Sequence, residues 1–167
     1  MSIEIETKIF SVEVDLDPQS GKIKEERWLD NNNKFNRLGD LPAVIQYCAD
    51  TGQPKYRRWH NGQGCHRSND RPSTIVTDTS SGMDIGLSFE ILGQSHREGD
   101  KPAFILKTPE GQLEEEGYWK DGNLHRDPEL GPARLFYSER TGKVTGFEYW
   151  VDGVQVPTPK EKPSLDI

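Results

Sequence analysis

The spacing of prolines is the feature of this sequence that most limits its fold. Four loop prolines recur at a constant step of 30 residues: Pro42, Pro72, Pro102 and Pro132. The segments around them match one another: "NRLGDLPA", "HRSNDRPS", "HREGDKPA" and "HRDPELGPA". Self-similarity at a fixed step is typical of proteins built from stacked copies of one supersecondary unit. The sequence therefore predicts a repeat array.

Each repeat has the pattern of a β-hairpin. A short apolar stretch follows each proline, and then comes a turn with glycine, which supplies the positive φ that such turns need. The turn glycines are Gly21, Gly52, Gly82, Gly111 and Gly142. No segment of about twelve residues carries the apolar stripe of a helix. We therefore predict an all-β fold: an extended antiparallel meander of about five hairpins and about ten strands, forming a single-layer or solenoid-like sheet.

The repeats are expected to form one domain over residues 1–156, with approximate bounds 8–36, 37–66, 67–96, 97–125 and 126–156. Arrays of this kind need capping at their ends. The segment "MSIEIETKIF" is a candidate cap, and residues 157–167, rich in proline and charge, are expected to form a flexible tail.

Composition favours a thin sheet over a thick core. Only 32% of the residues are hydrophobic, which is low for a two-layer globular domain. Intrinsic disorder is the competing interpretation, but the chain has 4 Trp, 6 Phe and 5 Tyr, which bury enough area to offset chain entropy.

Charge and cysteine content limit the partners and the location. The net charge of −7 disfavours nucleic acid and anionic membranes and would suit a basic protein partner. Cys48 and Cys65 form neither a CxxC pair nor a disulfide framework. No signal peptide or long apolar run is evident. A cytoplasmic protein without a cofactor is the expectation.

Tryptophans end the second strand of most repeats. We expect these residues to form the core as a ladder on one face of the sheet: Trp28, Trp59, Trp119 and Trp150. Glu90 stands where the third repeat should have its Trp. Phe89, Tyr118 and Tyr149 precede this position, so strand alternation predicts that they lie on the opposite face as an exposed contact surface.

The His-Arg pairs recur in register. The histidines are His66, His96 and His125, with Asn36 in the first repeat, and the arginines are Arg37, Arg67, Arg97 and Arg126. Equivalent residues of successive hairpins lie two strands apart, roughly 9.6 Å. One metal ion needs ligand atoms at about 2 Å, and a catalytic site needs a convergent cluster, so neither chemistry suits this ladder. We expect each Arg to clamp the acidic residue that follows in its own loop: Asp40, Asp70, Asp100, and Asp127 or Glu129. The histidine, or the asparagine in the first repeat, would form a hydrogen bond with the backbone.

Acidic residues outside this frame are the candidate partner-binding groups, together with the tyrosines. The set is Glu114, Glu115, Glu116, Tyr118, Asp121, Glu148, Tyr149 and Asp152. A solvated charged face is the alternative for the acidic members.

The units "YWKDGNLHRDPELGPA" and "RWHNGQGCHRSNDRP" resemble the W-x-x-G-x-x-H-R-x-D-G-P-A units of MORN-like and toxin–antitoxin-type β-hairpin repeat proteins, over about Ile23 to Val154. This resemblance implies an extended β array used for protein interaction, with no shared catalytic residues.

These observations favour a non-catalytic inhibitor, such as an immunity protein, an antitoxin or a phage-type inhibitor. It would occlude a basic partner with an acidic and aromatic face of the sheet. A structural scaffold or virion-associated module is the alternative, and an enzyme is the least favoured. The open sheet also leaves edges through which a homodimer could form.

Overall fold

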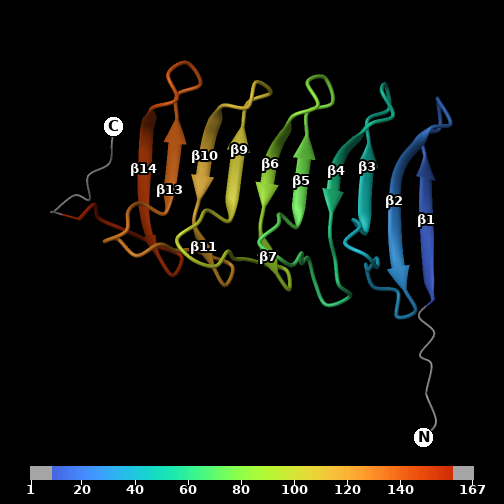
Figure 1. Ribbon diagram of the computed structural model, residues 1–167, viewed down its shortest axis with the longest axis horizontal. Helices are drawn as coiled ribbons and strands as arrows, with labels where there is room; N and C mark the ends of the chain where they lie inside the picture. The colour runs from blue at the N-terminus through green and yellow to red at the C-terminus, as the bar shows by residue number, and fades with distance from the viewer. Residues whose placement is uncertain (1–8, 160–167) are drawn as a thin grey trace, which may run out of the picture.

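A large antiparallel meander forms the protein, as predicted. The computed structural model describes residues 9–159, and the proposed N-terminal cap and C-terminal tail fall mostly outside that range. Eleven strands lie side by side in one open sheet (Figure 1). In spatial order they are β1 (Phe10–Leu16), β2 (Ile23–Asp30), β3 (Val44–Tyr47), β4 (Pro54–Arg58), β5 (Thr74–Thr77), β6 (Asp84–Ser88), β9 (Phe104–Lys107), β10 (Leu113–Gly117), β13 (Arg134–Tyr137), β14 (Val144–Val151) and β15 (Val154–Val156).

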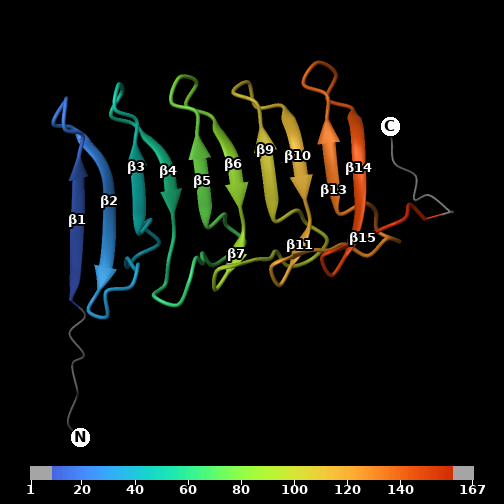
Figure 2. The same ribbon diagram turned by 180° about the vertical axis from the view of Figure 1, so that it is seen from behind.

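Two small hairpins interrupt the loops at the lower end of the sheet (Figure 2). They are β7 (Glu90–Ile91) with β8 (Gln94–Ser95), and β11 (Trp119–Lys120) with β12 (Asn123–Leu124). The part of the chain that the structure describes has no helix long and apolar enough to cross a membrane.

The upper turns repeat the same geometry. All five predicted turn glycines have positive φ, from 67° at Gly142 to 88° at Gly111. Each hairpin also carries a β-bulge close to its turn, where one residue of the second strand has no partner opposite. Glu114 is the bulge residue of β10, between Leu113 and Glu115.

One row of side chains crosses the sheet from β2 to β14, just above the lower loops. It alternates the aromatic residues Trp28, Trp59, Phe89, Tyr118 and Tyr149 with the small residues Ala43, Ser73, Ala103 and Ala133. We call the side of the sheet that carries this row the ring face and the other side the opposite face. The small residues have at most 1% exposure, so each fits between two rings.

The prediction of the tryptophan register was wrong for the later repeats. Trp119 and Trp150 come one residue after the aromatic position, which Tyr118 and Tyr149 occupy. The expectation that Phe89 and Tyr149 are exposed was also wrong, because they are only 6% and 3% exposed. The fourth and fifth repeats carry two adjacent aromatic residues, so spacing from tryptophan alone selects the wrong one.

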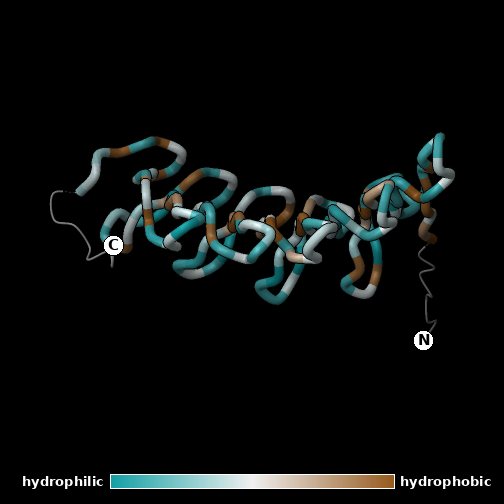
Figure 3. The backbone as a smooth tube through the Cα atoms, turned by 90° about the horizontal axis from the view of Figure 1, so that it is seen from above, coloured by the Kyte–Doolittle hydropathy of each residue, from teal (hydrophilic) through white to brown (hydrophobic). Residues whose placement is uncertain are grey.

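The sheet has little fully buried volume, as the composition suggested. The largest side chains that are fully buried are Pro132, Cys65 and Ser73, all small or medium in size. Seen from above, short hydrophobic segments alternate with hydrophilic turns along the chain (Figure 3). Stability in such an array comes mainly from contacts between neighbouring repeats.

Candidate functional site

The repeated arginines stack on the rings that end the hairpin just before them in the chain. The Arg37 guanidinium lies 3.9 Å from the centroid of the Trp28 ring, and Arg67 lies 3.8 Å from that of Trp59. Arg97 over Phe89 and Arg126 over Tyr118 repeat the arrangement at 3.6 and 3.9 Å. Each guanidinium also donates from Nη1 to the carbonyl of its loop proline, at 3.1–3.3 Å. Cation–π contact and hydrogen bond together fix the guanidinium plane.

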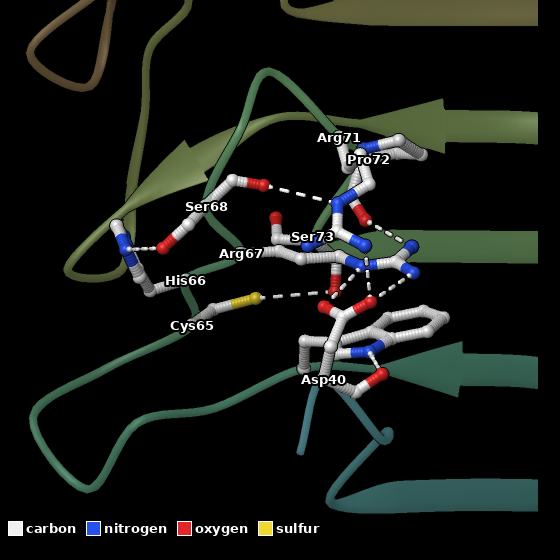
Figure 4. A network of polar contacts seen from close by, with 9 residues as sticks. Asp40, Cys65, His66, Arg67, Ser68, Arg71, Pro72 and Ser73 are labelled. Carbon is white, nitrogen blue, oxygen red and sulfur yellow. Dashed lines mark hydrogen bonds and ion pairs between the residues drawn. The ribbon is translucent and has the colours of Figure 1, made fainter. Parts of the chain in front are cut away.

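Each of the last three arginines clamps an aspartate of the preceding repeat. Arg67 donates from Nε and Nη2 to the two carboxylate oxygens of Asp40, both at 2.9 Å (Figure 4). Arg97 binds Asp70 in the same way at 2.6 and 3.3 Å, and Arg126 binds Asp100 at 2.7 and 2.6 Å. The expectation of a clamp within one loop was therefore wrong. The bidentate pairs join neighbouring repeats.

A second cation reinforces two of these clamps. Arg71 also contacts Asp40, and the Lys101 ammonium donates to Asp70 at 2.7 Å. The bonds from Arg97 and Lys101 lower the pKa of Asp70 to about 2, and Arg67 lowers the pKa of Asp40. Both carboxylates are therefore ionised at neutral pH and belong to structural ion pairs.

The histidines join repeats on the same lower edge. The backbone N–H of Asp121 donates to His96 Nδ1, and that of Asp152 donates to His125 Nδ1, both at 3.2 Å. The carboxylates of these aspartates lie 3.0 and 2.8 Å from the same nitrogens. The predicted histidine–backbone bonds are thus present in two repeats, but they reach the next repeat. Asp121 and Asp152 are accordingly engaged in the array.

His66 lacks this contact. Its Nδ1 atom is buried without a hydrogen-bond partner, and Leu92 occupies the position that Asp121 and Asp152 hold in later repeats. Leu92 has φ of 52°, in the left-handed region where Asp121 and Asp152 lie at 49°. Leucine is strained in this conformation, whereas aspartate and asparagine tolerate it.

Three equivalent grooves separate the successive loops. Their volumes are about 190 Å³ between the loops of Arg37 and Arg67, 170 Å³ between those of Arg67 and Arg97, and 260 Å³ between those of Arg97 and Arg126. His66 and His96 line one groove, and His96 and His125 line the next. Within residues 9–159, no group of three or more His, Cys, Asp or Glu side chains is placed to hold a metal ion.

A polar cluster that the sequence did not predict surrounds Glu90, the residue at an expected tryptophan position. Glu90 accepts hydrogen bonds from Ser73 Oγ at 3.2 Å and Thr74 Oγ1 at 3.3 Å, and it pairs with Arg58 at 3.3 Å. Arg58 Nε also donates to Cys65 Sγ at 3.2 Å. Burial, followed by the contact with Glu90, raises the pKa of the Cys65 thiol. A buried thiol with a raised pKa is a poor nucleophile, so this cluster acts as polar packing.

Cys48 has the opposite character. It begins the upper turn of the second repeat, a position that Asp17, Asp78, Thr108 and Ser138 take in the other repeats. Hydrogen bonds from the backbone and side chain of Thr51, and then from Thr79, lower the pKa of Cys48 to about 7. This thiol is half-exposed.

The acidic run of β10 does not form one patch. Glu115 and Glu116 point to opposite faces of the sheet. On the opposite face, Glu115 accepts a hydrogen bond from Arg134 Nε at 2.6 Å. On the ring face, Glu116 accepts one from the hydroxyl of Tyr137 at 2.6 Å. Glu114 is the bulge residue between them and the turn.

The opposite face gathers aromatic and charged residues over the last repeats. We call this set the opposite-face cluster: Phe104, Glu115, Trp119, Arg134, Phe136, Glu148 and Trp150. The Trp119 indole lies beside Gly117, where an added Cβ would meet Nε1 at 2.9 Å and Phe104 Cβ at 3.6 Å. Trp150 Nε1 donates to Glu148 at 2.9 Å, and Arg134 lies 4.8 Å from the Phe136 ring. All seven residues are half-buried.

The structure thus brings two predicted partner-binding residues together. Glu115 and Glu148 flank Arg134, at 2.6 and 3.8 Å. Tyr118 and Tyr149 lie on the ring face, away from them. Had Tyr118 and Tyr149 been assigned to the row of rings, strand alternation would have placed the next residues, Trp119 and Trp150, on the opposite face.

Comparison with known proteins returned no match: no protein-family model, curated protein or solved structure matches this chain.

Proposed function

We propose that this protein is a non-catalytic protein-binding module that docks a basic partner on the opposite-face cluster. The observation that carries the proposal is the grouping of two Trp, two Phe and one Arg on one half-buried sheet surface, flanked by carboxylates. Trp and Arg are enriched among residues that dominate binding energy at protein interfaces, and Phe is enriched in interface cores.

The charge supports a basic partner. The chain has a net charge of −7, and a field of one sign speeds encounter with a partner of the opposite sign. Three of the four repeated arginines, Arg67, Arg97 and Arg126, are held by aspartates of the array, so they add little free positive charge to the ring face. Arg134 in the cluster is likewise held, by Glu115 and Glu148.

We further propose that the module acts as an inhibitor in the cytoplasm, by covering a positively charged working surface of its partner. A single sheet is well suited to this role because it offers a broad, preformed surface whose rigidity lowers the entropic cost of binding. The resemblance of the repeats to MORN-like units agrees with a role in protein interaction. A scaffold that docks the same partner without inhibiting it is the alternative.

Affinity capture from the native cells at low and moderate salt tests the docking surface. The test variant is Phe136→Ser with Trp150→Ser, and the matched control is Phe35→Ser with Leu38→Ser, two exposed apolar residues of a lower loop. We expect wild type and control to recover one basic protein near stoichiometry, more strongly at low salt. The test variant should lose it while keeping the wild-type circular dichroism spectrum. Equal recovery by the test variant would remove the cluster from the interface.

Activity of the recovered protein then separates the two roles. Stoichiometric loss of its activity on adding this chain supports the inhibitor. Binding without loss of activity supports the scaffold.

A further inference from the structure

We propose that the outer edge of β1 is a second binding site, which takes an extended protein segment that alternates apolar and basic residues. The segment would pair with β1 as an additional antiparallel strand. This inference goes beyond the proposed function because it uses a different surface, at the other end of the sheet (Figure 1).

The edge is long and free within the described chain. β1 comes first in the spatial order of the sheet and pairs along all seven of its residues with β2 on one side. None of the described strands pairs with its other side. Every second residue therefore presents its backbone N–H and C=O outward, which is the arrangement that binds peptides by strand addition.

The two faces of β1 differ in chemistry. On the ring face, Val12, Val14 and Leu16 are 45%, 45% and 56% exposed. Three exposed aliphatic side chains on one face of a single strand are unusual. On the opposite face, the side chains of Glu13 and Asp15 are 53% and 52% exposed. An added strand would cover the aliphatic residues with one set of its side chains and face the carboxylates with the other.

The acidic side of the edge has excess negative charge. Glu13, Asp15 and Glu25 all contact one cation, Arg27, at 3.2, 3.1 and 3.4 Å. Three carboxylates share a single guanidinium, so Lys or Arg of an incoming strand would be attracted to Glu13 and Asp15. Opposite charges directly across a strand pair are stabilising and like charges are destabilising.

This charge pattern disfavours a second copy of β1 as the occupant. The antiparallel register that pairs all seven residues of two β1 strands places Glu13 opposite its own copy. The N-terminal residues of the chain would also bring carboxylates against Glu13 and Asp15, because Glu4 and Glu6 alternate there with Ile3 and Ile5. A basic alternating strand has no such conflict.

A peptide titration followed by NMR tests the site on the full-length protein. The probe is acetyl-Thr-Lys-Val-Lys-Val-Lys-Thr-amide, and its controls are the peptide with Glu for Lys and a scrambled peptide without alternation. We expect saturable shifts of the amides of β1 for the probe alone. A probe N-methylated on alternate residues should lose binding when the methyl groups face β1 and keep it when they face solvent, because strand addition needs the inward N–H groups.

A matched pair of variants tests the charge. Glu13→Gln with Asp15→Asn should weaken binding by roughly tenfold, since two exposed ion pairs are lost. Glu110→Gln with Glu139→Gln, in two exposed upper turns, makes the same change in net charge and should leave binding unaltered. The proposal is overturned if the probe does not bind, if the shifts lie on β14 and β15, if both variants behave alike, or if both N-methylated probes bind equally.

Discussion

Arg67 and Asp40 join two repeats through a pair of 2.9 Å hydrogen bonds, while the same guanidinium lies flat on Trp59 of the preceding hairpin. The arginine thus makes two contacts with the repeat before, one with its loop and one with its aromatic ring. Because the arrangement recurs at Arg97 and Arg126, each repeat is fastened to its predecessor. Stability of the array should therefore depend on nearest-neighbour terms.

Replacing Arg67 by Lys keeps the charge but removes the planar fork and most of the stacking. We expect a loss of about 1–2 kcal/mol in the free energy of unfolding, from the weaker charged hydrogen bonds and ring contact. Urea unfolding measures the loss, and hydrogen exchange should place it in the loops of Asp40 and Arg67. Arg140→Lys, on an exposed turn, is the control. Equal free energies of unfolding for the two variants would contradict a stabilising role for the planar guanidinium of Arg67.

Arg37 stacks on Trp28 but lacks the bidentate aspartate pair that the other three repeated arginines have. Ile9 stands 19 residues before Trp28, where Asp40 stands 19 before Trp59, and no carboxylate among residues 9–159 contacts Arg37. Ile9→Asp should therefore complete a fourth clamp and raise the free energy of unfolding by about 0.5–1 kcal/mol. Thermal melting tests this, with Ile9→Asn as control. The gain should vanish in the Arg37→Gln background, and its persistence there would point to another cause.

The strand pattern could be predicted because proline and glycine act locally and recur at one step. The partner of each arginine could not be predicted. The aspartate of its own loop and that of the preceding loop recur with the same period, so the sequence does not distinguish Arg67–Asp70 from Arg67–Asp40. Only the direction of the stacked guanidinium decides between them.

The opposite-face cluster was missed for a related reason. Phe104 and Phe136 come from first strands of two repeats, while Trp119 follows the second strand β10 and Trp150 lies near the end of the second strand β14. Their meeting depends on strand register and on the one-residue offset of the tryptophans, neither of which repeat spacing reveals. Glu115 and Glu148 were found because acidic residues beside aromatics stand out in the sequence.

Acid should weaken the link between the third and fourth repeats. Arg97 and Lys101 hold the pKa of Asp70 at about 2, below the unfolded value of about 3.9. A lowered folded pKa contributes stability that is full above about pH 5 and is lost progressively as the pH falls through the folded pKa towards about 1. Asp70→Asn should thus unfold in less urea than wild type near neutral pH, and the difference should shrink progressively as the pH falls from about 5 through 2 towards 1. Asp50→Asn, on an exposed turn, is the control for the loss of one carboxylate.

The strained leucine offers a stabilising substitution. Leu92 has positive φ, and Asp121 and Asp152 take the same conformation at the equivalent positions. Leu92→Asp should raise the free energy of unfolding by about 1 kcal/mol, because it relieves the strain and brings a carboxylate towards the unpartnered Nδ1 atom of His66. Ile91→Asp changes the neighbouring exposed residue without relieving strain and should not stabilise. A melting temperature of Leu92→Asp at or below that of wild type would contradict this assignment.

The two cysteines should react very differently with alkylating agents. The bonds from Thr51 lower the pKa of Cys48 to about 7, whereas burial raises that of Cys65. Only the thiolate is alkylated, so iodoacetamide should modify Cys48 of the native protein with a midpoint near pH 7 and leave Cys65 intact. Thr51→Val should move the midpoint to higher pH, and Cys48→Ser should abolish labelling. Rapid labelling of Cys65, or a Cys48 midpoint above about 8.5, the value of a free thiol, would contradict these assignments.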